Sequence, residues 1–548
     1  MGGKYTLVLL FLCLKLNNKT MKTLQTLLLL FLISICVNGQ DRKADSLVLV
    51  SIYNKLDGPN WVGADNWLSD KPIENWKGVK LVNDRVYKLN LNNFKVKGQF
   101  PVEVSKLDKL NTLEIKGGEL IGGIPVEIQE LKELSRLILD RDKLDGEIPN
   151  IFKNMDNLAT LTLNTNNLTG TLPDLPENLT LFYAQNNKLS GAIPESWRNH
   201  KLEALILERN NLTGSFDIIS TFPNLFSLDL DRNDWTASIF PTWIDDVPKL
   251  HRFSCEYCNL YGELPNDLDF SNLEEYYGMF ISGNKLSGDI SLLFNNGDYG
   301  KKMYLVARNN EFSGRVPIDI IKSFFSFQVN DNQYSSLSKL SKDALIGSCD
   351  ISGNNLNFEA LEPIRNLIEA DSVFTYNKQN DLLTKDTIII STATVIKIEA
   401  GDNHPNTKYK WMKNNGVLSE NSSELSIDIQ DNSSSGTYMC VLTNDIFPLL
   451  KIRRNSVVVK VDISTGTKQS DIDELVVFPN PTNGILNLKG LDRTVSNQYT
   501  ISSINGNIVK FGALKSSDNL DVGGLDSGIY ILSIGDTIKQ RKIKIIKF

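Results

Sequence analysis

Residues 158–173 read LATLTLNTNNLTGTLP, a stretch in which leucines alternate with polar residues and are followed by asparagine, glycine and proline. Alternating leucines are typical of a short strand with one buried face. A buried asparagine can bond backbone groups in the turn after the strand, glycine permits a positive φ, and proline fixes the return bend. The stretch therefore predicts one strand, one turn and one return segment.

The same pattern recurs along the chain, for example as LSRLILDRDKLDGEIP at residues 134–149 and LEALILERNNLTGSF at residues 202–216. Its asparagine position returns twelve times, at intervals of 21 to 26 residues. Because one such coil cannot bury its own apolar face, the coils are expected to stack into a solenoid with a parallel sheet on the concave side. The twelve positions are Phe94, Gly118, Asp142, Asn166, Asn187, Asn210, Asn233, Cys258, Asn284, Asn310, Asn332 and Asn354.

The repeat resembles that of the leucine-rich repeat family, and its Gly-x-Ile-Pro ending is similar to the plant-type subclass. The resemblance implies an α/β leucine-rich repeat solenoid of about twelve repeats over residues 86–370. Residues 41–85 are similar to the N-terminal cap of such arrays, with an amphipathic helix followed by Trp61, Trp67 and Trp76. The cysteine pair often found in that cap is missing, so we expect the tryptophans to seal the first coil. An aromatic platform for a glycan is the alternative.

The composition of the 548-residue chain excludes several classes of protein. An apolar content of 41% is too high for global disorder. The net charge of −7 gives no support for a nucleic-acid partner, which normally leaves a basic stripe. Three histidines and six cysteines argue against a His-rich metal site and a disulfide-dense scaffold. We therefore expect neither a metal nor a cofactor.

Cys255 and Cys258 form a Cys-x-x-Cys pattern of the kind seen in redox and zinc sites. In the repeat register, however, Cys255 takes an inward strand position and Cys258 takes the asparagine position. Cys349 replaces an inward leucine four coils later, too far from Cys255 for a disulfide. We expect all three to be packing residues, with redox or metal chemistry as the alternative.

Residues 1–40 contain two apolar stretches that are too short to span a bilayer. The second follows Met21-Lys22 and ends in Val37-Asn38-Gly39, which is the layout of a secretory signal peptide. We expect a leader and signal peptide in this segment, with Met21 as the possible true start. The mature chain is then exported and has no transmembrane span. A membrane anchor is the alternative.

Residues 386–465 carry alternating strands bounded by turns. Tyr409-x-Trp411, followed by Gly436-x-Tyr438-x-Cys440, resembles the signatures of two strands of an immunoglobulin-like β-sandwich. The position of the usual partner cysteine falls on Ala400. We therefore expect a small all-β sandwich without its core disulfide, and a lone buried thiol at Cys440.

Residues 470–548 contain FPNPTNG and end in the basic run RKIKIIKF. They resemble the type A C-terminal sorting domain of the type IX secretion system of Bacteroidetes. The resemblance implies a second small all-β sandwich, interaction with the type IX secretion machinery, and a secreted or outer cell-surface location. The positions carried over are Phe478, Pro479, Asn480, Pro481, Gly484, the Asn505-Gly506-Asn507 turn, Gly528, Tyr530 and the basic last strand.

The concave face of the array is the predicted binding site. Eleven coil steps of about 4.8 Å and strands about 17 Å long give about 900 Å², close to the roughly 800 Å² per partner of a standard interface. The predicted outward column is Asn90, Glu114, Ile138, Thr162, Tyr183, Ile206, Asp229, Ser254, Phe280, Val306, Gln328 and Asp350. Its candidate ligand-binding anchors are Ile138, Tyr183, Ile206, Phe280 and Val306, beside an acidic band of Asp140, Glu208, Asp231 and Glu256.

This pattern predicts a binding protein for a protein, peptide or glycan ligand. Apolar residues in the column could also be there only because they suit strands, in which case the array would be a structural or adhesion spacer. The third hypothesis is a carbohydrate-active enzyme that uses Glu208, Asp229, Asp231 and Glu256. The sequence shows no nucleophile elbow, phosphate loop or histidine constellation, so we expect no catalytic residue and no enzyme activity.

Overall fold

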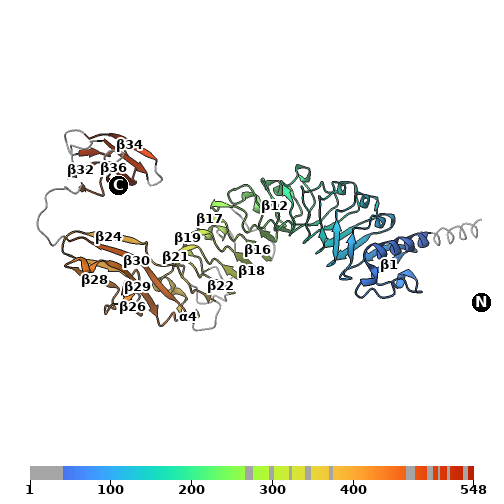
Figure 1. Cartoon of the computed structure of the whole chain (residues 1–548), viewed down its shortest axis with the longest axis horizontal. Coiled ribbons are helices and arrows are strands. Elements are labelled where there is room, and N and C mark those ends of the chain that lie inside the picture. Colours follow the sequence, from blue (N-terminus) through green and yellow to red (C-terminus); the bar gives the residue numbers. More distant parts are fainter. Residues whose placement is uncertain are drawn as a thin grey trace, which may run out of the picture. The chain divides into compact units, whose positions relative to one another are not determined.

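The computed structural model describes residues 41–265, 276–294, 302–319, 324–339, 347–368, 374–463, 476–489, 498–503, 507–514, 519–534 and 541–547. They form two compact units that divide after Asp462 (Figure 1). The predicted leader, signal peptide and Met21 start lie outside the described residues, as do Asn505 and Gly506 of the predicted turn. No helix in the described ranges is both long enough and apolar enough to cross a membrane.

The main element of the first unit is a parallel sheet with one short strand from each coil, preceded by an antiparallel strand at its N-terminal edge. This arrangement is the predicted α/β leucine-rich repeat solenoid (Figure 1). In order, the strands are β1 (Val79–Val82), β2 (Arg85–Asn90), β4 (Thr112–Lys116), β6 (Arg136–Asp140), β8 (Thr160–Thr162), β9 (Leu181–Tyr183), β11 (Ala204–Ile206), β13 (Ser227–Asp229), β14 (Arg252–Ser254), β16 (Tyr276–Phe280), β18 (Lys302–Val306), β20 (Phe324–Gln328), β22 (Ser348–Asp350) and β23 (Phe374–Thr375).

The return side of each coil is made of turns and very short strands. Glycines such as Gly170 and Gly214 have φ near +80°, as the repeat pattern predicts for this bend. The return strands are β3 (Lys97–Gln99), β5 (Glu119–Gly122), β7 (Lys143–Leu144), β10 (Ser190–Gly191), β12 (Asn211–Leu212), β15 (Tyr261–Glu263), β17 (Lys285–Gly288), β19 (Glu311–Val316) and β21 (Gln333–Leu337). The 3₁₀ turns are η3 (Val102–Lys106), η4 (Val126–Glu130), η5 (Phe152–Asn154), η6 (Glu195–Trp197), η7 (Asp217–Thr221), η8 (Thr242–Asp246) and η10 (Ile290–Phe294).

A buried asparagine ladder joins neighbouring coils behind the sheet. Asn166 shows the pattern: its Nδ2 donates to the carbonyl oxygens of Leu139 and Leu163, at 2.7 and 3.1 Å, and its Oδ1 accepts from the backbone N–H of Leu144. These backbone groups have no strand partner, and each would cost about 1–3 kcal/mol if buried unpaired. The same bonds recur at Asn187, Asn210, Asn233, Asn284, Asn310, Asn332 and Asn354.

The array continues one coil beyond the end that the sequence predicts at residue 370. Strand β23 pairs in parallel with β22, and Gln379 lies 25 residues after Asn354. Its Nε2 donates to the carbonyl oxygens of Ile351 and Tyr376, and its Oε1 accepts from the backbone N–H of Asn354. Gln379 therefore replaces the ladder asparagine, with one additional methylene group.

The prediction that Cys255 and Cys258 are only packing residues is wrong, because they form a disulfide. Their Cα atoms are 5.4 Å apart. Elsewhere in the ladder, the residue in the position of Cys258 donates to the carbonyl of the residue three positions earlier. The disulfide covalently joins the same two positions. Cys349 and Cys440 are free and buried, as expected.

An aromatic cluster covers the first coil. A helix over residues 41–55 is followed by η1 (Gly58–Asn60) and η2 (Ile73–Asn75). The ring of Trp67 lies 5.0 Å from those of Trp61 and Trp76, and Trp61 lies 5.6 Å from Phe94 at the first ladder position. The three tryptophans are at most 8% exposed, and each indole N–H donates to a backbone carbonyl. They seal the coil and do not form an open platform.

A β-sandwich follows the last coil in the same unit. Within it, Trp411 pairs with Cys440, and Tyr438 donates its hydroxyl to the carbonyl of Ser434, at 2.7 Å. A tyrosine two residues before the cysteine position that bonds back in this way is a feature of immunoglobulin sandwiches and supports the predicted similarity. The strands are β24 (Asp386–Ile390), β30 (Lys451–Val461), β29 (Gly436–Asn444), β26 (Thr407–Lys413) and β27 (Gly416–Val417) in one sheet, and β25 (Thr394–Glu399) and β28 (Glu424–Ile429) in the other.

Polar and aromatic contacts join this sandwich to the end of the array, where α3 (Phe358–Leu361), η12 (Glu362–Ile364) and α4 (Arg365–Ile368) lie. Asp402 of the sandwich accepts from the backbone N–H groups of Phe358 and Glu359 in the first turn of α3. Phe447 stacks on Phe358 with ring centroids 5.9 Å apart. The sandwich therefore closes the C-terminal end of the array.

The second unit is a smaller β-sandwich, as the sequence predicts. One sheet contains three strands and the other contains four, and leucine and isoleucine side chains fill the space between them. The strands are β31 (Val476–Phe478), β32 (Ile485–Lys489) and β35 (Asn519–Asp521) in the first sheet, and β34 (Ile508–Ala513), β33 (Gln498–Ser503), β36 (Gly528–Ile534) and β37 (Arg541–Lys547) in the second.

Candidate functional site

The predicted outward column lies in one row across the parallel sheet. Register pairing joins each of its residues to the next, from Asn90 on β2 to Asp350 on β22. The intermediate pairs connect Glu114, Ile138, Thr162, Tyr183, Ile206, Asp229, Ser254, Phe280, Val306 and Gln328 in this order. We call the side of the sheet that carries this row the outer face. It is the face that the sequence predicts to be concave.

The apolar anchors on this face are not equally accessible. Tyr183, Ile206, Phe280 and Val306 are half-buried, so part of each side chain meets solvent. Ile138 is only 1% exposed, which contradicts its predicted role as an accessible anchor. Two ion pairs between β4 and β6 flank it: Arg136 lies 3.6 Å from Glu114, and Lys116 lies 3.8 Å from Asp140.

Asp229 of the predicted outward column lies beside Asp231 of the predicted acidic band, and its Oδ1 accepts from the backbone N–H of Asp231. Both are more than nine-tenths buried. Asp231 accepts from the hydroxyl of Ser254 at 2.8 Å and from the backbone N–H of Glu256 at 2.7 Å. Burial raises the pKa of both carboxyl groups above the ordinary value of 3.8, and their mutual repulsion raises that of Asp231 further. These carboxylates make internal bonds to the sheet and are not free to bind a ligand directly.

Cationic side chains lie among these carboxylates. The guanidinium group of Arg252 is 3.5 Å from Asp229 and lies over the ring of Phe280, 4.3 Å from its centroid. Arg209 pairs with Glu208 at 2.9 Å. An arginine held between a carboxylate and an aromatic face combines charge with flat apolar area. The centre of the outer face is therefore mixed in charge, because arginines pair with carboxylates in and beside the predicted acidic band.

The described residues offer little for metal or acid–base chemistry. Among them, no group of three histidine, cysteine, aspartate or glutamate side chains could hold a metal ion. His200 donates from Nε2 to the carbonyl of Pro176 on the return side, and His404 pairs with Glu362 at the junction with the sandwich. The half-exposed apolar groups and the arginine–aromatic stack are suited to non-covalent binding.

The predicted sorting residues connect distant parts of the second unit. Asn480, between two cis X–Pro bonds, donates from Nδ2 to the carbonyl of Lys544 at 2.7 Å and accepts at Oδ1 from the N–H of Ile546. The carbonyl of Gly484 accepts from the N–H of Val522. Tyr530, which follows Gly528 on β36, donates its hydroxyl to the carbonyl of Asp526. The two hydrogen bonds of Asn480 thus join the FPNP segment to the basic last strand, β37. Phe478 itself is 47% exposed.

Comparisons with known families agree with this architecture. Residues 476–547 match the secretion system C-terminal sorting domain. Residues 79–212 match the leucine-rich repeat domain of the EGF-like domain-containing protein ComC. The chain is a leucine-rich repeat protein with a type IX secretion C-terminal sorting domain.

Two plant proteins are similar to part of the chain. Receptor-like kinase TMK2 of Arabidopsis thaliana is 27% identical over 190 residues, which are 29% of this chain and 21% of the kinase. Receptor-like protein 39 of the same plant is 27% identical over 147 residues, which are 26% of this chain and 16% of that protein. The chain thus spans about a fifth of the length of these relatives.

Two solved structures are also similar to part of the chain. The crystal structure of a TDR receptor is 20% identical and covers 55% of this chain and 52% of its own, with a TM-score of 0.45. The PEPR1–AtPEP1 structure is 21% identical, covers 63% of this chain and 62% of its own, and has a TM-score of 0.41.

The roles of Arg252 and Gln379, and the unpaired oxygen at the predicted ladder position Asp142, were not predicted. Arg252 lies two residues before the column residue Ser254, and its guanidinium group contacts Phe280 on the next coil, which only the register brings near. The extra coil at Gln379 follows the 25-residue spacing and could have been found from it. Asp142 takes a ladder position, but its Oδ2 is buried without a hydrogen-bond partner, and burial raises its pKa to about 6.

Proposed function

We propose that this leucine-rich repeat protein is a secreted or cell-surface binding protein that holds a protein, peptide or glycan ligand on the outer face of its parallel sheet. The observation that carries the proposal is the pair of half-exposed apolar groups on either side of the buried acidic strands. Tyr183 and Ile206 lie on one side and Phe280 and Val306 on the other. The names of the plant relatives, which describe receptor-like proteins, support the same role.

The spacing of these groups sets the size of the ligand contact. From β9 to β18 there are five strand steps, or about 24 Å at about 4.8 Å each. An extended peptide covers that distance with about seven residues. Aromatic and aliphatic anchors at both ends, with polar groups between them, are typical of interfaces in which a few side chains provide most of the affinity.

The test compares the same substitution at half-buried Ile206 and at exposed Ile121. Ile206→Glu places a charge in the row, whereas Ile121→Glu places the same charge on return strand β5, where Ile121 is 41% exposed. The purified protein is first screened on a glycan array and an extracellular peptide library. We expect Ile206→Glu to weaken a saturable ligand at least tenfold and Ile121→Glu to leave it unchanged. Equal affinities would favour the spacer function, and hydrolysis of an array member would favour the enzyme.

We further propose that the sorting domain takes the chain across the outer membrane by type IX secretion. The family match over residues 476–547 supports this route. Removal of residues 470–548 is expected to leave the precursor in the periplasm. Protease accessibility on intact cells measures the exported fraction, and unchanged export of the shortened chain would contradict the proposal.

A further inference from the structure

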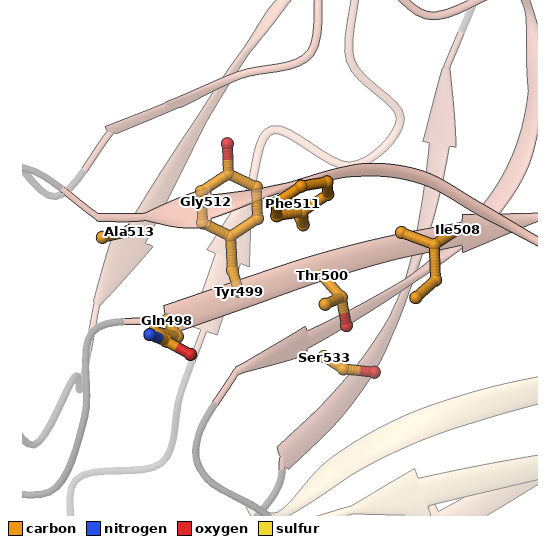
Figure 2. Close-up of a pocket in the computed structure, with 8 residues that line it drawn as sticks. All are labelled: Gln498, Tyr499, Thr500, Ile508, Phe511, Gly512, Ala513 and Ser533. Carbon is orange, nitrogen blue, oxygen red and sulfur yellow. The ribbon is translucent and has the colours of Figure 1, made fainter.

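The outer surface of the four-stranded sheet in the sorting domain has a groove of about 630 Å³. Its described lining residues come from β33, β34 and β36, and none of them carries a charged side chain (Figure 2). Phe511 and Ile508 on β34 are 77% and 63% exposed, which is high for large apolar residues in a small domain. Thr500 lies on β33, which pairs with β34, and Ser533 lies on β36, which pairs with β33.

Two rows of residues cross this sheet, and in both the side chains change from apolar on β34 to cationic on β37. Register pairing places Phe511, Thr500, Ser533 and Lys542 in one row and Ile508, Ser502, Ile531 and Lys544 in the next. Each row begins with an exposed apolar side chain on β34 and ends with an exposed lysine on β37. A hydroxyl group follows the apolar residue in both rows. Neither row contains a carboxylate.

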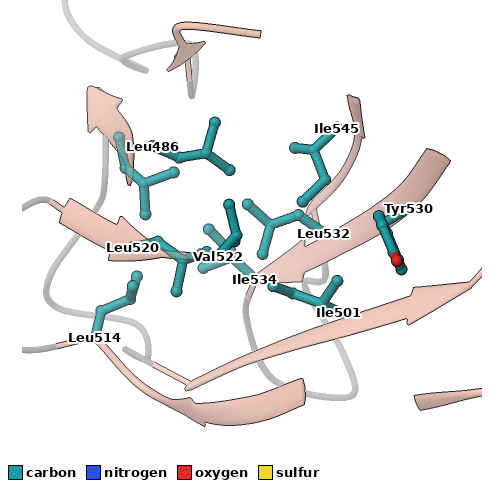
Figure 3. Close-up of a cluster of buried hydrophobic side chains, with 10 residues drawn as sticks. Leu486, Ile501, Leu514, Leu520, Val522, Tyr530, Leu532, Ile534 and Ile545 are labelled. Atoms are coloured by element: carbon teal, nitrogen blue, oxygen red, sulfur yellow. The ribbon is translucent and has the colours of Figure 1, made fainter. Parts of the chain in front are cut away.

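The opposite surface of the same sheet packs into the core and is not available. Ile501, Tyr530, Leu532 and Ile534 belong to the same buried cluster as Leu486 and Leu520 of the other sheet (Figure 3). The inner residues alternate along the strands with those of the two rows, as a two-layer sandwich requires. The exposed phenylalanine and isoleucine are therefore not needed for the core of this sandwich.

We propose that this surface is where the export machinery docks, by an extended acidic segment of a protein whose apolar side chain fills the groove beside Phe511 and whose carboxylates pair with Lys542 and Lys544. The proposal rests on the proposed export function. The charge complementarity follows from the lysine edge, and the apolar anchor follows from the uncharged groove.

Other occupants fit the surface less well. Three strand steps of about 4.8 Å and two rows about 7 Å apart give, with the side chains, on the order of 300 Å². A stable second copy of this chain would need about 800 Å² per partner. A membrane surface could attract the lysines, but acyl chains offer no hydrogen bonds to the half-buried Thr500, whereas peptide groups do.

The test uses the full precursor in its own bacterium and a matched pair of variants. Ile508→Glu changes the groove, and Ile485→Glu makes the same change on β32 of the other sheet, where Ile485 is 58% exposed. We expect Ile508→Glu to lower the exported fraction about tenfold and Ile485→Glu to leave it near that of the unchanged protein. Lys542→Glu with Lys544→Glu should also lower export, and Lys542→Arg with Lys544→Arg should keep it.

Protease resistance of the retained precursor checks that the variants fold. Equal export of Ile508→Glu and Ile485→Glu would overturn the docking surface while leaving the export function intact. Export that survives removal of residues 470–548 would overturn the export function itself. Purified precursor is also mixed with an acidic peptide, Glu-Val-Glu-Phe-Glu-Val-Glu, and with phosphatidylglycerol vesicles. Vesicle binding without peptide binding, or a dimer that Ile508→Glu dissociates, would also overturn the proposal.

Discussion

The two ends of the repeat array are closed in different ways. Aromatic rings cover the N-terminal end, and a ladder of hydrogen-bonded amide side chains reaches the C-terminal end. The first three ladder positions hold Phe94, Gly118 and Asp142, and Phe94 packs into the tryptophan cluster. At the other end the ladder runs without interruption through Asn354 to Gln379. A solenoid can thus close an open coil either by excluding water from it or by supplying partners for its backbone groups.

Substitution in the N-terminal aromatic cluster is expected to have the largest effect on the free energy of unfolding. Trp67→Ala removes a buried side chain and leaves the carbonyl of Lys77 without its indole donor. We expect a loss of about 4 kcal/mol in the free energy of unfolding, measured by urea denaturation. Phe226→Ala is the control, because Phe226 is 51% exposed on the array. Similar losses for both variants would show that the cluster does not close the coil.

Loss of one ladder residue near the C-terminal end should lower the free energy of unfolding somewhat less than Trp67→Ala does. Asn354→Ala leaves the carbonyls of Val329 and Ile351 and the N–H of Tyr334 without their side-chain partner. We expect a loss of about 3 kcal/mol in the same measurement. Asn211→Ala, at an exposed residue on β12, should change stability by less than about 0.5 kcal/mol. A near-neutral Asn354→Ala would contradict the hydrogen-bonded closure.

The smallest expected effect is an increase in the free energy of unfolding. It comes from a substitution that extends the ladder toward the N-terminal end. Asp142→Asn supplies an Nδ2 donor for the carbonyls of Ile115 and Leu139, which take the positions that the other ladder residues bond. The carboxyl pKa is about 6 in the folded chain and ordinarily 3.8, so the folded state binds its proton more tightly. The stabilisation from Asp142 is present below about pH 4 and is lost as the pH rises through 6.

We therefore expect Asp142→Asn to stabilise the protein by about 2 kcal/mol at pH 7 and by much less at pH 4. Urea midpoints at the two pH values measure the difference. A gain that is equal at both values would mean that proton binding at Asp142 is not involved.

Some features of the array can be predicted from the sequence and others cannot. The leucine and asparagine spacing predicts the sheet, and with it the row from Asn90 to Asp350, because a period of two fixes which side chains share a face. Burial of Ile138 could not be predicted, since a period of two does not show the ion pairs between neighbouring coils that flank it. Gln379 was missed because the pattern specifies asparagine, although the longer amide reaches the same carbonyls. The disulfide at Cys255 joins two positions that look like ordinary repeat positions in the sequence.

The in-register pairing of the outer row has a consequence for how such a protein can change over generations. Each coil contacts mainly the coils on either side of it, so the duplication or loss of one whole coil would leave the row continuous. A change of about 24 residues would lengthen or shorten the outer face by one strand step of about 4.8 Å. The reach of the array can therefore be altered by copying a unit, with no new fold and no redesign of the ends.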